Sequence, residues 1–454
     1  MSIGHRHNVK GARTTVVGAA RSGLAAARLL RAHGADVFVT DSGVLSTKVR
    51  NELDELGIGY EFGGHTAAGF EADFLVTSPG VPPTTMMLTG AQDQDIPVYS
   101  EIEVASWFCA APIIGITGSN GKTTTTSLTG HVLSRSGRRT WVAGNIGLPF
   151  AAIVDRVEPE DVVVLEISSF QLEHTATFRP TISILLNITP DHLDRYDGSM
   201  AKYADTKCRI CAYQVAGDTL IYNLDDPRLA DLAYRTPALD RLGFSLESRS
   251  GAAYVQNDTI HLRLNGKHEP LMQTEQLALR GRHNLYNSLA AAVAARVMEV
   301  RSDVVRESLA TFEGVPHRLE EIREVHGVRY INDSKATNVN AVWYALESMR
   351  EPVVLLAGGR DKGNDYEPLR PLVAAKVKTL ICFGEAAPAI SEALGQSVPK
   401  TLRARDLQEA VELAAEEALD GEIVLLSPAC ASFDQFDNYE QRGNAFKRLV
   451  NSLK

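Results

Sequence analysis

Apolar runs alternate along the chain with stretches whose apolar residues recur at helical spacing. DVVVLEISSFQLE at 161–173 and TISILLNITPDHLDRY at 181–196 are rich in β-branched and aliphatic residues and predict strands. The alanine-rich GRHNLYNSLAAAVAARVMEV at 281–300 predicts a helix. Repeated alternation of strand and helix is typical of α/β folds, in which helices cover a mainly parallel sheet.

Two interruptions of this alternation divide the chain into three segments. PVYSEIEVASWF at 97–108 predicts a connector, and a further segment begins near Gly314. We therefore expect an α/β protein with a Rossmann-like domain at 1–99, a central P-loop ATPase domain with a mainly parallel sheet at 100–314, and a second Rossmann-like domain at 315–454. A chain of 454 residues is long enough for each domain to bury a core of its own.

Composition narrows the classes of function. The hydrophobic fraction of 44% and the charged fraction of 22% are typical of a soluble globular protein, and no apolar run reaches membrane length, so we expect no membrane insertion. The N-terminal MSIGHRHNVKG lacks the apolar core of a signal peptide. A net charge of −10 argues against nucleic acid as a partner, so an anionic ligand must be held by local lysines, arginines and helix N-termini.

Cysteine usage is typical of a reducing cytoplasm. The five cysteines are odd in number and form no disulfide framework in a chain of this length. Cys208 and Cys211 form a C-x-x-C sequence within a helical pattern, with no second pair at zinc spacing. We interpret both as buried helix residues, with redox or metal use as the remote alternative.

A glycine-rich sequence between a predicted strand and a predicted helix is the strongest functional signal. GITGSNGKTTTT at 115–126 follows the strand-like APIIGIT, and the helical pattern begins at Lys122. Glycines let backbone N–H groups approach a polyphosphate, the helix N-terminus favours negative charge, Lys122 can bridge phosphates and Thr123 can bind Mg²⁺. The strict Walker spacing requires glycine where Ile116 stands, so this is a variant loop. An ordinary glycine turn is the disfavoured alternative, because the predicted strand, the loop, the Lys-Thr pair and the predicted helix all fit a phosphate-binding loop.

The first segment opens like a nucleotide-binding βαβ unit. RTTVVGAARSGLAAARLLRAHGADVFVTDSG predicts a strand, a glycine turn at 18–23, a helix and a second strand that ends at Asp41. Ala20 stands where a dinucleotide fingerprint has its second glycine, and its Cβ hinders approach to a pyrophosphate, which disfavours NAD. The SPG turn at 78–80 is equally compatible with a ligand site and with a structural turn.

Polar residues at the ends of other predicted strands add candidate chemistry. Glu166 is suited to holding a metal ion with Thr123, the alternative being a solvated surface carboxylate. Asp191 and His192 follow the next strand, where a helix cap and an ordinary histidine would look alike. Lys207 lies in a helical pattern, and by residue type it is a solvent-facing charge. Groups that could bind phosphate or carboxylate thus occur at strand ends in all three segments, which suggests a ligand-binding cleft between the domains. The third segment contributes His317, Arg318, Asp333, Ser334, Lys335, Thr337, Arg360, Lys362 and Ser432.

Together these motifs resemble those of the Mur ligases, ATP-dependent amide-forming enzymes of bacterial peptidoglycan synthesis. The resemblance is strongest to the members that join D-glutamate to UDP-N-acetylmuramoyl-L-alanine, through ISSFQLE, NDSKATN and SPACASFDQFDNYEQRGNAF. Members that add a diamino acid are expected to carry a DNPR-type motif in the third domain, and the third segment has none. The matching motifs span all three predicted domains: GxxGxxGKT (115–123), LEISSFQLE (165–173), NITPDHLDR (187–195), GRHNLYN (281–287), PHR (316–318), NDSKATN (332–338) and GGRDKG (358–363).

The resemblance implies three ligand sites. The first domain would bind the UDP part of the muramoyl nucleotide, the second would bind ATP, and the third would bind ATP and D-glutamate. The residues matched to the UDP substrate are Arg21, Ser22, Asp41, Ser42, Asn145 and His192, although the GAARSG turn departs from the family's GxGxxG-like turn. The residues matched to ATP are Gly118, Asn120, Gly121, Lys122, Thr123, Thr124, Asn284, Asn287, Arg318 and Asp333. The residues matched to the amino acid are Thr337, Lys362, Ser432 and Tyr439, the last of which is usually Phe in the family.

The resemblance also implies magnesium and a modified lysine. The family's lysine that matches Lys207 is carboxylated by CO₂, which turns a cation into an anionic oxygen ligand for Mg²⁺. Two Mg²⁺ sites are implied, one near Thr123 and Glu166 and one near His192 and Lys207. Lys122, His192 and Lys207 are the implied catalytic residues.

The implied reaction has two steps: the L-alanyl carboxylate attacks the γ-phosphate of ATP, and the amine of D-glutamate then attacks the acyl phosphate. A cytoplasmic monomer is expected. Another Mur ligase or a folylpolyglutamate-type ligase stays open, although the latter lacks a nucleotide-binding domain like residues 10–97. A P-loop regulatory or transport NTPase is the alternative from a different class, and a NAD-linked dehydrogenase is a weaker third.

Overall fold

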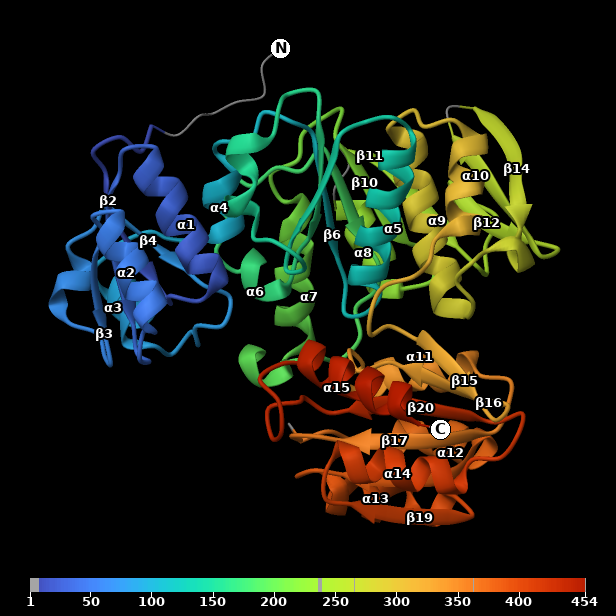
Figure 1. The fold of residues 1–454 in the computed structure, drawn as a ribbon. Helices are drawn as coiled ribbons and strands as arrows, with labels where there is room; N and C mark the ends of the chain where they lie inside the picture. The colour runs from blue at the N-terminus through green and yellow to red at the C-terminus, as the bar shows by residue number, and fades with distance from the viewer. Residues whose placement is uncertain (1–7, 236–238, 265, 362, 454) are drawn as a thin grey trace. The chain divides into compact units, whose positions relative to one another are not determined.

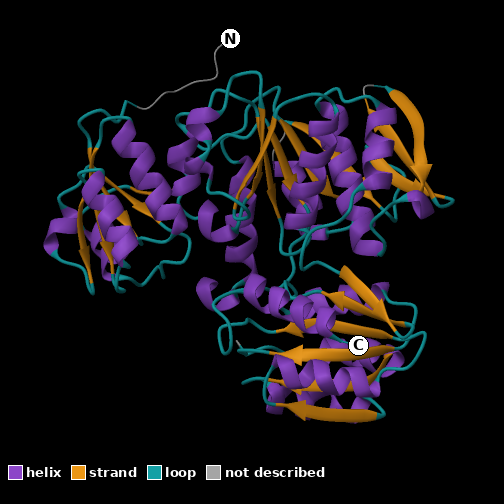
Figure 2. Ribbon diagram, viewed as in Figure 1, coloured by secondary structure: helices purple, strands orange, loops and turns teal. Residues whose placement is uncertain are grey.

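The predicted α/β class is confirmed: the chain folds into three sheets, each mainly parallel and accompanied by helices (Figures 1 and 2). The structure, a computed structural model, describes residues 8–235, 239–264, 266–361 and 363–453.

A five-stranded parallel sheet forms the N-terminal segment. Its strands, in sheet order, are β3 (Gly59–Phe62), β2 (Asp36–Asp41), β1 (Arg13–Val17), β4 (Phe74–Thr77) and β5 (Val98–Ser100). Its helices are α1 (Arg21–Ala32), α2 (Thr47–Glu55) and α3 (Met86–Asp93). In the central strand β1, Val16 pairs with Val39 of β2 and Val76 of β4, and all three are buried. The chain order reverses between β1 and β4, so a ligand crevice is expected at the carboxyl ends of these strands.

A nine-stranded sheet forms the middle of the chain. In sheet order its strands are β14 (Lys267–Gln273), β13 (Thr259–Leu264), β12 (Ala253–Gln256), β11 (Asp240–Ser245), β10 (Thr219–Asn223), β9 (Ile182–Leu185), β6 (Ile113–Thr117), β8 (Val162–Glu166) and β7 (Thr140–Gly144). Pairing is parallel except in β12–β13–β14. Because β6 lies between β9 and β8, the segments that follow these three strands meet at one edge of the sheet. The helices are α4 (Glu101–Ser106), α5 (Lys122–Arg135), α6 (Ser169–Leu172), α7 (Met200–Cys208), α8 (Pro227–Arg235), α9 (Arg282–Val297) and α10 (Ser302–Thr311).

A six-stranded sheet forms the C-terminal segment. In sheet order its strands are β15 (Glu320–Val325), β16 (Val328–Asn332), β20 (Ile423–Ala429), β17 (Val353–Gly358), β18 (Val377–Phe383) and β19 (Lys400–Ala404), and only β15 is antiparallel to its neighbour. The helices are α11 (Val339–Ser348), α12 (Arg370–Lys376), α13 (Ala387–Leu394), α14 (Leu407–Glu417) and α15 (Tyr439–Ser452). Apolar cores lie on both faces of this sheet, as the continuous apolar runs of its strands predict.

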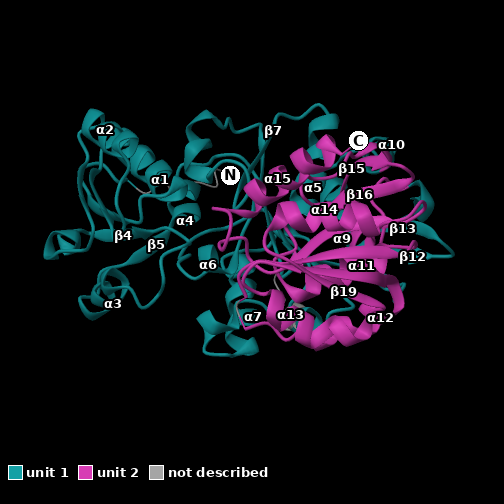
Figure 3. Cartoon of the chain, turned by 60° about the horizontal axis from the view of Figure 1, so that its bottom comes forward, with its two compact units in different colours: residues 1–276, 286–309 teal, residues 277–285, 310–454 magenta. Residues whose placement is uncertain are grey.

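The chain divides into two compact units. One comprises residues 1–276 and 286–309, and the other comprises 277–285 and 310–454 (Figure 3). The first unit thus contains two of the sheets, and the second unit contains the six-stranded sheet. The predicted domain boundaries after residues 99 and 314 stay predictions.

Three predicted segments differ in detail from the structure. The range 161–173 is a strand only as far as Glu166, because Ser168 and Gln171 form a capping box that starts α6. The range 181–196 is a strand only as far as Leu185, and a loop and a 3₁₀ turn follow. The connector at 97–108 contains β5 and α4.

The connector helix α4 is anchored by a buried carboxylate. Glu103 is fully buried and accepts hydrogen bonds from Trp107 Nε1 at 2.9 Å and from the backbone N–H groups of Ala176 at 2.9 Å, Thr177 at 3.0 Å and Phe178 at 2.8 Å. These donors compensate the carboxylate for the water it has lost. Glu103 therefore fixes α4 to the segment that precedes β9.

The two cysteines of the C-x-x-C sequence differ in burial. Cys208 ends α7 and is half-buried, whereas Cys211 is buried in the following 3₁₀ turn. The prediction of two buried helix residues is therefore wrong for Cys208, because α7 ends there. Among the described residues, no helix has both the length and the apolar character needed to cross a membrane.

Candidate active site

The glycine loop joins β6 to α5, which begins at Lys122. Gly121, the N-cap residue, has a φ of +84°, a left-handed conformation that favours glycine. A Cβ on Gly121 would lie 2.4 Å from Asn287 Oδ1, and a Cβ on Gly118 would lie 2.9 Å from Leu186 Cβ. The first turn of α5 has no acidic residue, so the helix itself places no negative charge at the N-terminus that would repel a phosphate.

Two lysine side chains converge on one carbonyl oxygen of this loop. Lys122 Nζ donates to Gly118 O at 2.7 Å and to Ser119 O at 2.8 Å. Lys207 Nζ donates to the same Gly118 O at 2.9 Å. The positive charge of Lys122, the more exposed of the two, would favour a polyphosphate beside the loop.

Lys207 is almost completely buried, with 1% of its surface exposed. Its Nζ lies 4.7 Å from the centroid of the Tyr203 ring, one turn earlier on α7. Burial, and next the charge of Lys122, lower the pKa of Lys207 well below its ordinary value, although Asp191 and Glu166 oppose the shift. The interpretation of Lys207 as a solvent-facing charge is wrong, because α7 turns the face that carries Tyr203 and Lys207 into the protein.

Glu166 is also buried, at the end of β8. Asn145 Nδ2 donates to Glu166 Oε1 at 2.8 Å, and the backbone N–H of Asn145 donates to Glu166 O at 2.8 Å. Gly144 has a φ of +103°, and a Cβ on it would lie 2.3 Å from Glu166 O. The alternative of a solvated surface carboxylate is therefore excluded, and Asn145 is held beside Glu166.

Hydroxyl and amide groups surround the start of α5. Thr123 and Thr124 are buried in its first turn, and Thr125 Oγ1 donates to Asn287 Oδ1 of α9 at 3.1 Å. The backbone N–H of Asn120 donates to Asn187 Oδ1 at 2.9 Å, which fixes the loop to the segment after β9.

His192 lies in the loop after β9 with a φ of +50°. Its Nε2 is 3.7 Å from Asp191 Oδ1, and its ring meets the Phe170 ring edge-on at a centroid distance of 5.1 Å. The guanidinium of Arg195 lies over the same Phe170 ring at 4.4 Å. His192 is thus oriented by neighbours from α6 and from its own loop.

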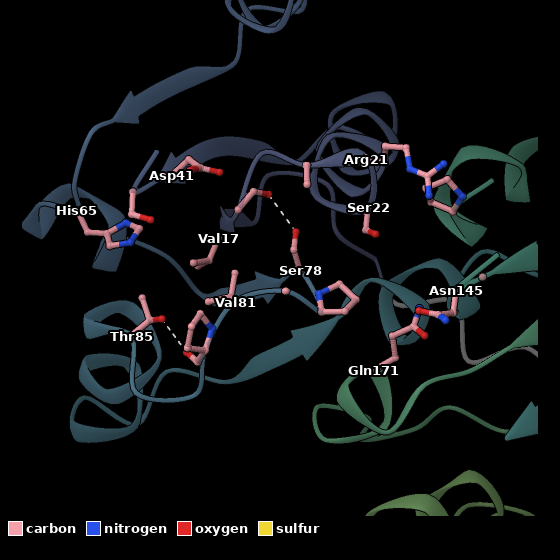
Figure 4. A pocket seen from close by; sticks show the side chains of 18 of the residues that line it. Val17, Arg21, Ser22, Asp41, His65, Ser78, Val81, Thr85, Asn145 and Gln171 are labelled. Carbon is pink, nitrogen blue, oxygen red and sulfur yellow. Dashed lines mark hydrogen bonds between the residues drawn. The ribbon is translucent and has the colours of Figure 1, made fainter. Parts of the chain in front are cut away.

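A cavity of about 400 Å³ opens at the carboxyl edge of the first sheet and extends to residues of the second sheet (Figure 4). Its size suits a small-molecule ligand. His65 and Asp41 lie toward one end of the view, and Asn145 and Gln171 lie at the other. Within the described chain His192 does not line this cavity. The other five residues matched to the UDP substrate do line it: Arg21, Ser22, Asp41, Ser42 and Asn145.

Asp41 and Ser78 tie together the turns around the cavity. Asp41 accepts from the backbone N–H of Ala19 at 2.6 Å and from that of Gly43 at 2.7 Å. Ser78 Oγ donates to Gly18 O at 3.0 Å (Figure 4). The SPG turn at 78–80 therefore lines the cavity and supports the glycine turn, and its role as a ligand site stays a prediction.

In the second unit, a buried carboxylate interacts electrostatically with Arg318. Asp333 is 3% exposed, and Ser427 Oγ donates to its Oδ2 at 2.9 Å. Burial raises the pKa of Asp333 to about 7, while Arg318 and the hydrogen bond from Ser427 oppose the increase. Asn284 is also buried, and its Nδ2 donates to Arg280 O at 2.8 Å.

The residues matched to the amino acid lie at strand ends and at the start of a helix. Thr337 follows β16, Ser432 follows β20, and Tyr439 begins α15 with its ring centroid 5.0 Å from Lys335 Nζ. Lys362 lies outside the described residues.

Sequence analysis missed Arg442, a completely buried residue of α15. Its guanidinium donates to Ser334 Oγ at 3.1 Å and O at 2.8 Å, to Cys430 O at 3.1 Å, to Ala431 O at 3.3 Å and to Gly358 O at 3.4 Å. It thus joins the last residue of β17 to the segments that follow β16 and β20. Arg442 lies within the matched sequence SPACASFDQFDNYEQRGNAF, but an arginine in a polar helical pattern does not by itself indicate burial.

Comparison with known proteins identifies the family. Family models match at residues 13–87 (MurD N-terminal domain), 116–295 (Mur ligase middle domain) and 317–430 (Mur ligase, glutamate ligase domain). UDP-N-acetylmuramoylalanine--D-glutamate ligase of Salinibacter ruber is 54% identical over 98% of this chain and 99% of its own length. The chain belongs to the Mur ligase family. The ligase of the same name from Chloroherpeton thalassium is 45% identical to this Mur ligase over 98% of this chain and 99% of its own length.

Solved structures share the fold of this Mur ligase. A pseudomurein peptide ligase type C from Methanothermus fervidus aligns with a TM-score of 0.62 and 18% identity, covering 98% of this chain and all of its own. UDP-N-acetylmuramate-alanine ligase MurC from Thermotoga maritima aligns with a TM-score of 0.61 and 18% identity, with the same coverage of 98% and 100%.

The residues beside the loop fit the ATP and magnesium that Mur ligases use. The glycine positions that exclude a Cβ and the charge of Lys122 suit a polyphosphate. The Glu166 carboxylate and the Thr123 hydroxyl are oxygen donors of the kind that Mg²⁺ prefers. An unmodified, protonated Lys207 cannot be a Mg²⁺ ligand, because an ammonium group has no lone pair to donate to the metal ion. Across the described residues, no group of three or more His, Cys, Asp or Glu side chains could hold a metal ion.

Proposed function

We propose that this Mur ligase joins D-glutamate to UDP-N-acetylmuramoyl-L-alanine, driven by ATP, in the synthesis of peptidoglycan precursors. The observation that carries the proposal is the match of the MurD N-terminal domain at residues 13–87, together with relatives of that activity's name that align over 98% of the chain. The convergence of Lys122 and Lys207 on the glycine loop supports phosphoryl transfer at that loop.

The reaction begins with phosphoryl transfer. A carboxylate oxygen of the L-alanyl residue forms a bond to the γ-phosphorus of ATP, the bond to the β,γ-bridging oxygen breaks, and ADP leaves. Lys122 and the N-terminus of α5 stabilise the negative charge on the phosphates, which is the main requirement of this step. We assign the nucleotide to Gly118, Asn120, Gly121, Thr123 and Thr124, of which Asn120 already donates its backbone N–H to Asn187 Oδ1.

Amide formation follows. The amine of D-glutamate attacks the acyl carbon, the nitrogen loses a proton, and inorganic phosphate leaves from the tetrahedral intermediate. In the second unit we assign the amino acid to Thr337, Lys362, Ser432 and Tyr439. We assign the remaining ATP contacts to Asn284, Asn287, Arg318 and Asp333.

Lys207 acts in this scheme as a carbamate. Its neutral amine attacks CO₂, an N–C bond forms, a proton leaves the nitrogen, and the product carries an anionic carboxylate. Burial supports this assignment, because a lowered pKa leaves a larger fraction of the amine uncharged. Magnesium bound near Thr123 and Glu166, and near His192 and modified Lys207, would neutralise phosphate charge during transfer.

The cavity of the first unit is the proposed site of the UDP substrate. Arg21 and Ser22 lie at the N-terminus of α1, which favours binding of a diphosphate. Asn145 lies beside the Glu166 carboxylate, at the end of the cavity closer to the residues proposed to act in phosphoryl transfer. His192 is assigned to the middle of the same substrate. We propose that the protein works as a cytoplasmic monomer.

The proposed reaction is tested by incubating the protein with UDP-N-acetylmuramoyl-L-alanine, ATP, Mg²⁺ and D-glutamate and identifying the product by mass spectrometry. We expect the mass of the nucleotide substrate plus one glutamyl residue. Lys122→Ala should remove this product and keep binding of the UDP substrate, whereas the exposed Lys202→Ala should keep both. A Lys122→Ala variant with near-normal turnover would contradict the role of the loop.

A further inference from the structure

A chain of hydrogen bonds connects one wall of the cavity to a buried threonine. Thr40 on β2 is completely buried, and its Oγ1 lies 2.7 Å from Glu61 Oε1 and 2.7 Å from His65 Nδ1. Glu61 also accepts from the backbone N–H of Thr66 at 3.0 Å and from Thr66 Oγ1 at 2.6 Å. All of these groups belong to the first sheet and the segment that follows β3.

The hydrogen bonds between Glu61, Thr40 and His65 determine the tautomer of His65. Burial alone would raise the pKa of Glu61, but the hydrogen bonds from Thr40 and Thr66 hold it below its ordinary value, so Glu61 is an ionised acceptor. The single hydroxyl proton of Thr40 must then be donated to Glu61. Thr40 Oγ1 can therefore only accept from His65, which places the imidazole proton on Nδ1.

The consequence lies on the other side of the ring. With its proton on Nδ1, a neutral imidazole has an unprotonated Nε2 that acts as an acceptor. The two ring nitrogens point in widely different directions, so Nε2 is directed away from Thr40. His65 lines the cavity, and Figure 4 shows its ring at the opposite end from Asn145 and Gln171.

We propose that His65 recognises the uracil base of the nucleotide substrate. In this interaction His65 Nε2 accepts a hydrogen bond from the imide N3–H of uracil. The proposal rests on the proposed function, since it takes the UDP substrate to lie in this cavity. The diphosphate is assigned to the N-terminus of α1, so the base extends toward the end of the cavity that carries His65. Asp41 is nearby, but both of its oxygens already accept from the backbone N–H groups of Ala19 and Gly43.

This arrangement discriminates between pyrimidines. Uracil carries a proton on N3, whereas N3 of cytosine is an unprotonated acceptor. Cytosine would therefore place a lone pair against the lone pair of His65 Nε2 and leave a polar group without a partner, a loss that typically weakens binding about tenfold or more.

Two substitutions separate the two ring nitrogens of His65. The amide of Asn can reproduce the Nδ1–H donor to Thr40 but has no atom at the Nε2 position. The amide of Gln is long enough to place an oxygen near the Nε2 position. His65→Asn therefore removes the proposed contact and keeps the internal one, and His65→Gln is its matched control.

The experiment measures, by isothermal titration calorimetry, the affinity of the full-length protein for UDP, CDP and N3-methyl-UDP. The wild type should bind UDP about tenfold or more tightly than either analogue. His65→Asn should lose most of this preference with an unchanged KM for ATP and for the amino acid, and His65→Gln should retain it in part.

The contradicting outcomes are distinct. If wild-type protein binds N3-methyl-UDP as tightly as UDP, or if His65→Asn keeps the wild-type preference for UDP over CDP, the role of His65 is wrong while the proposed function stands. If the wild type binds no uridine nucleotide at all, the proposed function itself is contradicted. The N3-methyl arm uses only the wild type, so it decides the matter even if a variant fails to fold.

Discussion

Lys122 and Lys207 donate hydrogen bonds to the same carbonyl oxygen, that of Gly118, at 2.7 and 2.9 Å. Lys207 is buried and Lys122 is half-buried, and a positive charge on both at one acceptor is unfavourable, so burial and the charge of Lys122 lower the pKa of Lys207. Carboxylation of Lys207 would reverse its charge and convert this repulsion into attraction. The geometry thus gives a physical reason for a modification that residue type alone does not suggest.

Carboxylation of Lys207 can be observed directly. We expect protein equilibrated with ¹³CO₂ to show one protected carbamate signal in its ¹³C NMR spectrum, and Lys207→Ala to lack it. Turnover of Lys207→Ala should fall about a hundredfold or more, because an anionic group in the phosphoryl-transfer site is lost. Lys202→Ala, on the exposed face of the same helix, is the control and should keep both signal and turnover. A carbamate signal that survives in Lys207→Ala would assign the modification elsewhere.

Arg442 should position the amino-acid site without touching the substrate. Arg442→Lys keeps the charge but cannot form the five hydrogen bonds that join the three strand-end segments. We expect a loss of about 3 kcal/mol in the free energy of unfolding and a KM for D-glutamate raised about tenfold. Urea denaturation and steady-state kinetics measure the two effects.

The matched control for this variant is Arg448→Lys, an exposed position on the same helix. It should change neither quantity. An Arg442→Lys variant with wild-type stability would show that the buried hydrogen bonds contribute little.

Asp333 should make stability depend on pH. Its pKa is about 7 in the folded chain and ordinarily 3.8, so the folded state binds the proton more strongly, and stability is lost as pH rises through 7. Asp333→Asn carries no such charge. Relative to the wild type, the variant should gain thermal stability at pH 8, and the gain should shrink toward pH 5, while ligase activity falls. Differential scanning calorimetry at both pH values tests this; a difference that does not vary with pH would contradict it.

Glu103 should be a purely structural carboxylate. Glu103→Ala leaves the N–H groups of Ala176, Thr177 and Phe178 and the indole of Trp107 without their acceptor. We expect the free energy of unfolding to fall by about 3–5 kcal/mol. Glu103→Gln, which keeps one acceptor oxygen, should lose less. Equal losses in the two variants, measured by urea denaturation, would refute the hydrogen-bonding explanation.

The sequence correctly predicted the helix and strand ends that are marked by a clear local pattern, such as a run of glycines or the βαβ pattern. The helix at Lys122 begins where the glycines end, and Asp41 ends its strand as the βαβ pattern indicates. The pattern misplaced the end of β8, because the capping box that stops the strand after Glu166 lies within an otherwise apolar sequence.

The candidate site was harder to predict because its key positions depend on contacts distant in sequence. Lys207 is 89 residues from the carbonyl to which it donates, and Arg442 is 108 residues from Ser334. Only the family resemblance pointed to Lys207. For His65, nothing in the local pattern reveals the tautomer that Thr40 and Glu61 impose.

Coupling of phosphate release to both substrates tests the proposed function most directly. The measurement is the rate of phosphate release from ATP in the presence of UDP-N-acetylmuramoyl-L-alanine and a panel of amino acids that includes both enantiomers of glutamate. We predict release that requires the nucleotide substrate and is fastest with D-glutamate. Release that ignores both substrates, or that is fastest with any other amino acid, would contradict the proposed function.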